Sequence, residues 1–321
     1  SIILGACSNP SINNVTSLPN SIHKLHLDSI NSGILLNGTD IIATENFLVI
    51  ANYLKDTIFD VFNIDNLNYL YSDITLGHGP NDILNFRSIR YLNKNNIYSI
   101  GLGIPLTSRI SIGQEVDIEE NMMIDLEGDI CQDMYILSDD KILIQQNKGE
   151  GEWALYNKNN KEFTNLPKSI YNGFEPKASD IQTFQYRAVN VAIKNDKSKF
   201  AFFNYYLPYI RIYDSNGNLT YQSFVEKKPE DYYSLLLEEE VYYSRCYATN
   251  DYIFVKYFSS DEQKKGTSIQ VWDWDGKLQH LIELDSELHL FTISTDAKRL
   301  FGLKMDSDYI YYCDLTTTIH S

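Results

Sequence analysis

The chain has 321 residues and a formal net charge of −16, from 43 acidic and 27 basic side chains. That balance argues against a nucleic-acid partner or an anionic membrane face, because binding to phosphates needs a basic surface. Tyr (24) and Phe (15) are abundant and Pro (8) is scarce, which suits a fold with many half-buried strands.

The first twenty residues resemble an export signal followed by a spacer. Leu4-Gly5-Ala6-Cys7 follows apolar residues and resembles a bacterial lipobox, in which Cys7 would carry the lipid. The alternative is a chance run of small residues before an ordinary cysteine. Ser8 in place of Asp favours the outer membrane, and the lack of an acidic tag favours its periplasmic side over the cell surface. We therefore expect 1–20 to be a signal remnant, lipobox and tether, and 21–321 to be a single domain.

After the tether, a polar turn followed by an apolar strand returns six times. Counted at one equivalent apolar residue in each repeat, the spacings are 50, 45, 58, 53 and 47 residues. A period near fifty residues with several strands per unit is typical of a β-propeller. The sequence therefore predicts an all-β fold, a six-bladed β-propeller. The six equivalent positions are Phe47, Ile97, Ile142, Phe200, Ile253 and Leu300.

Each blade should contain four antiparallel strands, named A to D from the central channel outward. The hairpin between C and D is the clearest element, because Asn216-Gly217 and Asp275-Gly276 supply the positive φ that such turns need. In blade four the expected strands are Thr183–Ile193, Lys199–Tyr205, Tyr209–Asp214 and Leu219–Val225.

The two ends of the chain predict how the ring closes. The last repeat has strands A to C, ending with Tyr309–Asp314, and then lacks its outer strand. Ile22–Leu27 is an extra strand that precedes the first blade. We expect this N-terminal strand to complete the last blade as its strand D, which would cover an open sheet edge.

Two turns resemble those of a known family. The step Gly77-His78-Gly79-Pro80-Asn81-Asp82 is similar to the Gly-x-Gly-Pro-x-Asp step of the TolB-like six-bladed propeller lipoproteins of Bacteroidetes. Ser294-Thr295-Asp296-Ala297-Lys298 is similar to the Ser-Pro-Asp-Gly-Lys turn of TolB-type propellers, with Thr295 replacing Pro and Ala297 replacing Gly. The likeness in architecture runs from Ile22 to about Leu315. It implies a propeller anchored in the cell envelope, in a family whose members mostly lack a defined activity.

The Gly77–Asp82 step is the first candidate site. We expect it to place His78 and Asp82 near the channel mouth, on the face formed by the D-to-A and B-to-C connections. The alternative is a structural turn between blades, which the glycines permit and Pro80 stiffens. His78 has no second ligand at metal spacing, so neither a metal site nor a cofactor is predicted. The remaining cysteines have no metal or disulfide spacing and are expected to be buried thiols: Cys131, Cys246 and Cys313.

Arginines on the inner strands form the second candidate site. Arg87, Arg90, Arg187 and Arg245 lie on strands that also carry aromatic residues. Guanidinium groups lining a channel in an acidic protein can bind a carboxylate or phosphate through two parallel hydrogen bonds. The alternative is that Asp and Glu within the blades pair with these arginines, which would then support the ring.

Two long connections beside blade four, 168–180 and 226–240, form the third candidate site. The aromatic side chains Tyr232, Tyr233, Tyr171 and Phe174 can stack there on a sugar ring or on a partner's side chains. The alternative is that these aromatic residues pack their own loops.

These features favour a non-catalytic envelope lipoprotein whose loop face binds a protein, peptide or glycan partner. The alternative is a propeller enzyme acting on a polysaccharide, as a glycoside hydrolase or lyase. Glycoside hydrolysis needs two carboxylates roughly 5–10 Å apart, and the candidates are Asp82, Asp180 and Glu240. Two buried carboxylates facing each other would favour the enzyme, whereas a mouth lined by arginine and tyrosine would favour binding.

Overall fold

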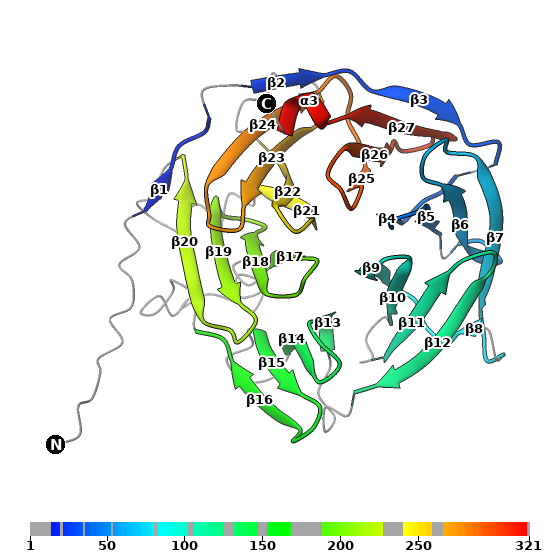
Figure 1. Ribbon diagram of the computed structural model, residues 1–321, viewed down its shortest axis with the longest axis horizontal. Helices are drawn as coiled ribbons and strands as arrows, with labels where there is room; N and C mark the ends of the chain where they lie inside the picture. Colours follow the sequence, from blue (N-terminus) through cyan, green and yellow to red (C-terminus); the bar gives the residue numbers. More distant parts are fainter. Residues whose placement is uncertain are drawn as a thin grey trace.

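The computed structural model contains six β-sheets arranged as blades around a central axis (Figure 1). Within each sheet the strands A to D are antiparallel and run in order from the axis outward. The predicted all-β, six-bladed propeller is therefore confirmed. The structure describes residues 14–19, 22–34, 36–52, 54–79, 82–101, 106–124, 131–146, 153–167, 188–226, 240–258 and 266–319.

The blades follow one another along the chain. Blade one contains β4 (Asp40–Ala43), β5 (Phe47–Ala51), β6 (Thr57–Asn63) and β7 (Tyr69–Leu76), and β8 (Asp82–Ile83) pairs with the outer edge of β7. Blade two contains β9 (Ser88–Asn93), β10 (Asn96–Ile100), β11 (Leu106–Ile112) and β12 (Val116–Met123). Blade three contains β13 (Cys131–Ile136), β14 (Lys141–Gln146), β15 (Trp153–Asn157) and β16 (Glu162–Asn165).

The second half of the ring repeats this order. Blade four contains β17 (Val189–Ile193), β18 (Lys199–Asn204), β19 (Tyr209–Asp214) and β20 (Leu219–Val225). Blade five contains β21 (Tyr243–Ala248), β22 (Tyr252–Tyr257), β23 (Ser268–Asp273) and β24 (Leu278–Leu284). Blade six contains β25 (Leu290–Ile293), β26 (Arg299–Leu303), β27 (Tyr309–Asp314) and the N-terminal β3 (Asp28–Asn31). The four-residue helix α3 (Thr316–Ile319) follows, and no helix among the described residues is long and apolar enough to cross a membrane.

Three short N-terminal strands run along the outside of the ring and form a belt (Figure 1). β1 (Val15–Thr16), which lies in the segment expected to be a tether, pairs in parallel with β20 of blade four. β2 (Ile22–Leu25) pairs in parallel with β24 of blade five, and β3 pairs antiparallel with β27 of blade six. An N-terminal strand thus completes the last blade, as predicted.

The residues that close the ring differ from the expected ones. Ile22–Leu27 was expected to be the outer strand of blade six, but Ile22–Leu25 adds a fifth strand to blade five, and Asp28–Asn31 closes blade six. The chain crosses between the two blades at Leu27, which is buried and whose backbone N–H donates to the Asp285 carboxylate (3.2 Å). The outer edges of blade five and of blade six can each pair with a further strand. Strand propensity alone therefore does not predict which of the two edges a segment covers.

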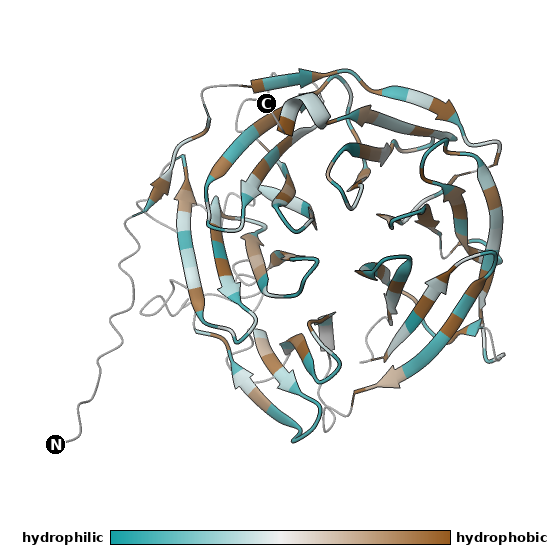
Figure 2. Ribbon diagram, viewed as in Figure 1, coloured by the Kyte–Doolittle hydropathy of each residue, from teal (hydrophilic) through white to brown (hydrophobic). Residues whose placement is uncertain are grey.

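Most of the core lies between the blades. The described residues form six apolar clusters, one at each interface between neighbouring blades. Successive residues of a strand point to opposite faces of its sheet, so Ile41 packs against blade six while Ile42 packs against blade two. Figure 2 shows hydrophobic residues, in brown, in the strands of every blade. This arrangement fixes the inner strands, and therefore the walls of the central channel.

Hydrogen bonds from cationic side chains also link neighbouring blades at their turns. In three blades the first residue of strand B is a cation that donates to a backbone carbonyl in the C-to-D turn of the next blade. These contacts are Lys141 to Ser215 (3.1 Å), Lys199 to Trp274 (2.9 Å) and Arg299 to Ile64 (2.8 Å). In these three blades, the residue just before the repeat position that identified the blade in the sequence therefore links it to the next blade.

Candidate functional site: the central channel

A cavity of about 450 Å³ lies on the ring axis, where the inner strands converge. Residues of all six inner strands line it, namely β4, β9, β13, β17, β21 and β25. A cavity of this size is within the range of small-molecule and side-chain binding sites. We therefore treat the channel as the candidate functional site.

The charged residues of this cavity are unlike those of the chain as a whole. Among the described residues, four cations and two carboxylates line it: Arg87, Arg90, Lys197, Arg245, Asp40 and Asp133. Four cations against two anions leave a formal excess of +2, in a chain whose net charge is −16. A cleft with low-dielectric walls concentrates the field of the charges that line it. The channel therefore favours an anionic ligand, although the protein surface as a whole does not.

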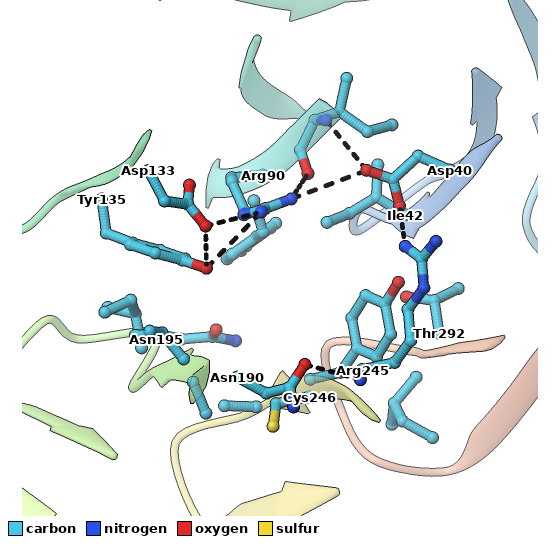
Figure 3. Close-up of a pocket in the computed structure, with 18 of the residues that line it drawn as sticks. Asp40, Ile42, Arg90, Asp133, Tyr135, Asn190, Asn195, Arg245, Cys246 and Thr292 are labelled. Atoms are coloured by element: carbon cyan, nitrogen blue, oxygen red, sulfur yellow. Dashed lines mark hydrogen bonds and ion pairs between the residues drawn. The ribbon is translucent and has the colours of Figure 1, made fainter. Parts of the chain in front are cut away.

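Asp40 is the centre of the charged network (Figure 3). It is the first residue of β4, and its side chain is only 4% exposed. Its two oxygens accept hydrogen bonds from the backbone N–H groups of Ile41 (3.0 Å) and Ile89 (3.1 Å). The guanidinium groups of Arg245 (3.1 Å) and Arg90 (3.6 Å) approach it from blades five and two. A buried carboxylate is tolerated because all of these donors compensate its lost hydration.

Arg90 connects Asp40 to a second carboxylate. Its Nη2 lies 3.6 Å from Asp133 and 3.5 Å from the Tyr135 hydroxyl, which in turn donates to Asp133 (3.2 Å). The guanidinium also lies over the Tyr135 ring, 5.2 Å from its centre. Burial opposes its charge, but Tyr135, Asp133 and Asp40 together raise the pKa of Arg90 above its usual value. Arg90 is therefore a permanent cation held between blades one, two and three.

Arg245 reaches the same network from a strained backbone position. Its φ is 51°, at a bulge between Ser244 and Cys246 in β21. A left-handed conformation at a non-glycine residue costs about 1–3 kcal/mol, and such strain is common at functional sites. The Arg245 N–H donates to the Asn190 side chain (3.1 Å), which holds the bulge in place. The Arg245 side chain is 34% exposed, so it can contact a ligand while it also binds Asp40.

The cysteine next to Arg245 is not suited to chemistry. Burial raises the pKa of the Cys246 thiol well above its usual value. The thiolate is the reactive form of cysteine, so this side chain stays a neutral part of the cavity wall. Cys246 and Cys313 are both free thiols; Cys313 is buried, as predicted, whereas Cys246 is half-buried.

Lys197 is a cation that lines the cavity without a carboxylate partner. It lies in the turn after β17, with φ 63°, and its Nζ donates to the Tyr91 carbonyl (3.4 Å) and lies over the Tyr91 ring. Within the described part of the chain, Lys197 makes no ion pair. Burial lowers its pKa from 10.5 to about 8, against the opposing effect of Asp196. It is still mostly protonated at neutral pH, so its charge is available to a ligand.

Three of the predicted site residues, Arg87, Arg90 and Arg245, line the channel. The Arg87 side chain is exposed. Arg187, Tyr232 and Tyr233 lie outside the described residues. The same is true of Cys7, Tyr171, Phe174 and Asp180.

His78 and Asp82 do not reach the channel, which corrects their expected position. β8 begins at Asp82 and pairs in parallel with the end of β7, so the step lies at the outer edge of blade one. The Asp82 carboxylate accepts hydrogen bonds from the Thr75 hydroxyl and the Gly79 N–H, which lower its pKa. A Cβ at Gly77 or Gly79 would overlap this carboxylate. The step is thus a turn organised by Asp82, the alternative that sequence analysis left open.

Other important channel residues were missed by the sequence analysis. Asp40, Asp133, Asn190 and Lys197 were not proposed. Asp40 and Asp133 could have been found from the inner-strand arginines, because buried cations need carboxylate partners. Lys197 had no such signal, because its place in the wall depends on the conformation of one turn.

Among the residues that the structure describes, no three His, Cys, Asp or Glu side chains come together as a group that could hold a metal ion. Glu240, a candidate for catalysis in the sequence, is exposed, accepts a hydrogen bond from the Tyr242 hydroxyl (3.1 Å) and is not part of the cavity wall.

Comparison with known proteins shows the fold and nothing finer. No protein-family model and no curated protein matches this sequence. A crystal structure of a member of the DUF4221 family from Bacteroides vulgatus ATCC 8482 is similar, with a TM-score of 0.59 and 13% identity, over 90% of this chain and 95% of that one. Regucalcin from Agrobacterium tumefaciens strain C58, described as a calcium-binding protein, has a TM-score of 0.50 and 10% identity, over 91% and 94% of the two chains. These likenesses support a propeller that spans nearly the whole chain.

Proposed function

We propose that this protein is a non-catalytic binding protein that holds a carboxylate-bearing peptide, protein or glycan at its central channel. The observation that carries this proposal is the excess of cations in the cavity wall of a strongly acidic protein. Arg245 is partly exposed, and Lys197 has no carboxylate partner among the described residues, so both can donate to a ligand oxygen. Hydrogen bonds between two charged groups are about twice as strong as neutral ones.

The arrangement of the two carboxylates in the cavity wall supports binding over glycoside hydrolysis. Asp40 and Asp133 both contact Arg90, which lies between them. An acid and a base that act on a glycosidic bond have to face each other across the substrate. Here a guanidinium occupies that space, and Tyr98 and Tyr135 complete the wall.

We further propose that the propeller is a TolB-like lipoprotein of the bacterial envelope, anchored at the outer membrane through Cys7 and facing the periplasm. The Leu4–Cys7 lipobox and the two family-like turns support this proposal, as does the fold shared with a Bacteroides protein. In cells fed radiolabelled palmitate, the full-length precursor should be labelled, and Cys7→Ser should abolish the label. Label that survives this substitution would exclude Cys7 as the lipid site.

The binding proposal can be tested with matched peptides. Pentaglutamate and pentaglutamine have the same backbone and nearly the same size, and differ in charge. By isothermal titration calorimetry at low salt, we expect the protein to bind pentaglutamate and not pentaglutamine. An oligogalacturonate is the acidic glycan probe, and we expect it to bind as well. Lys197→Gln should weaken acidic-probe binding about tenfold, since one charge-assisted hydrogen bond contributes about 1.5–3 kcal/mol.

Lys197 is the better test position because its removal breaks no ion pair. Arg245→Gln would also take a partner from buried Asp40, so lost binding there could reflect a damaged channel. Arg109→Gln is the control, because Arg109 pairs with Asp139 (2.7 Å) and does not line the cavity. No binding of either acidic probe, or equal binding by wild type and Lys197→Gln, would contradict the proposal.

A further inference from the structure

Two histidines face each other on the outer side of blade five, away from the channel. His23 lies on the belt strand β2, and His280 lies on β24. His23 Nε2 and His280 Nδ1 are 3.3 Å apart, and the ring centres are 5.2 Å apart with a tilt of 66°. Both residues are half-buried. The two ring nitrogens therefore meet at short range from segments 257 residues apart in the sequence.

We propose that His23 and His280 bind a zinc ion, which joins the N-terminal belt to blade five. Zinc bonds to histidine nitrogen at about 2.0–2.1 Å, and a tetrahedral angle then separates two such nitrogens by about 3.3 Å. The observed separation matches that value. A square-planar copper site would need neighbouring nitrogens about 2.8–2.9 Å apart, which is closer than these rings lie.

The strand register holds the two rings in position. β2 pairs in parallel with β24, so that Ile22 lies opposite Leu281 and His23 opposite Ile282. Leu25, on the same face of β2 as His23, packs into the apolar cluster between blades five and six. The rings are thus fixed before any metal arrives, which lowers the entropic cost of binding.

The site has two protein ligands and leaves the other positions to water. No third His, Cys, Asp or Glu joins the pair among the described residues. When zinc enters, the ring N–H between the two nitrogens moves to the outer nitrogen of its own ring, so no proton needs to be lost. A metal held by β2 and β24 binds the folded state and not the separated strands. Zinc should therefore stabilise the protein by mass action.

Zinc binding can be measured directly on the full chain. By equilibrium dialysis against zinc chloride at pH 7.5, followed by metal analysis, we expect one zinc per wild-type chain and none for His280→Gln or His23→Asn. In thermal unfolding, zinc should raise the Tm of the wild type by a few degrees and saturate at one equivalent bound. Circular dichroism of each variant without metal checks that the propeller remains folded.

The chain offers a matched control three residues away. His26 belongs to the same belt, but its ring contacts the Asp285 carboxylate. His26→Gln should lower the starting Tm and keep both the zinc stoichiometry and the increment in Tm. Magnesium, which prefers oxygen ligands, should have no effect in any variant. Zinc bound equally by His280→Gln, or lost in His26→Gln, would overturn the assignment to His23 and His280.

Discussion

At the scale of single residues, Lys197 keeps a positive charge in the channel wall at the expense of stability. Its pKa is lowered to about 8 by burial, from 10.5 in the unfolded chain, so the unfolded state holds this proton more tightly than the folded state does. Between these two pH values the unfolded chain binds more protons, and stability therefore rises with pH. The penalty is fully present below pH 8 and disappears above about pH 10.5.

Lys197→Met should therefore be more stable than the wild type at pH 7, with a difference that shrinks as the pH approaches 10. Urea unfolding at pH 7, 8.5 and 9.5 measures this difference, and effects of groups common to both proteins cancel. Lys298→Met is the control, because Lys298 is exposed and pairs only with Asp296 in its own turn. A destabilised Lys197→Met at pH 7 would contradict the account. A stabilised variant that also loses acidic-probe binding would show that function maintains this lysine against stability.

The residues of the channel were only partly predictable from the sequence. Inner-strand arginines beside aromatic residues pointed correctly to Arg87, Arg90 and Arg245 as channel residues. Their partners were not predicted, because Asp40 and Asp133 belong to other blades and meet Arg90 only when the ring has closed. The bulge that positions Arg245 depends on a hydrogen bond from the Arg245 backbone N–H to the Asn190 side chain, which no local pattern encodes.

At the scale of strands and turns, prediction was most accurate where local chemistry fixes the backbone. β19 and β20 have the predicted bounds, because Gly217 supplies the positive φ (84°) of the turn that joins them. The start of an inner strand is less well defined by the sequence: Thr183, the expected start in blade four, lies outside the described residues, within which β17 begins at Val189. An apolar run before an inner strand also suits the connection that leads inward across the blade. Hydrophobicity alone therefore does not mark the residue at which the strand begins.

For the Gly-x-Gly-Pro step, the local sequence predicted the turn but not its distance from the ring axis. The sequence correctly indicated a tight turn there, but its position around the ring depends on where the chain leaves β7. β8 adds a short strand to the outer edge of blade one, so the turn is made at the rim and not beside the axis. A turn motif defines local geometry, whereas its distance from the axis is a property of the whole blade.

At the scale of the whole molecule, the ring depends on one short strand to join its two ends. β3 supplies the outer edge of blade six, and Ile30 pairs with Ile310 and packs into the cluster between blades one and six. β1 and β2 instead add a fifth strand to blades four and five, which already have four strands each (Figure 1). The belt therefore contains one strand that closes the ring and two that only cover its edges.

Two N-terminal truncations separate these roles. Removing 1–26 deletes β1 and β2 and keeps β3, so we expect a folded propeller with a single unfolding transition and a modestly lower Tm. Removing 1–31 also deletes β3 and exposes the edge of β27, so that blade six is no longer tied to the N-terminal end of the chain. Because each blade contacts mainly its neighbours, an open ring should lose cooperativity and unfold over a broader temperature range at a much lower Tm.

Differential scanning calorimetry of both truncations measures the Tm and the width of the transition. Equal values for the two would mean that the interfaces between blades, and not β3, hold the ring closed.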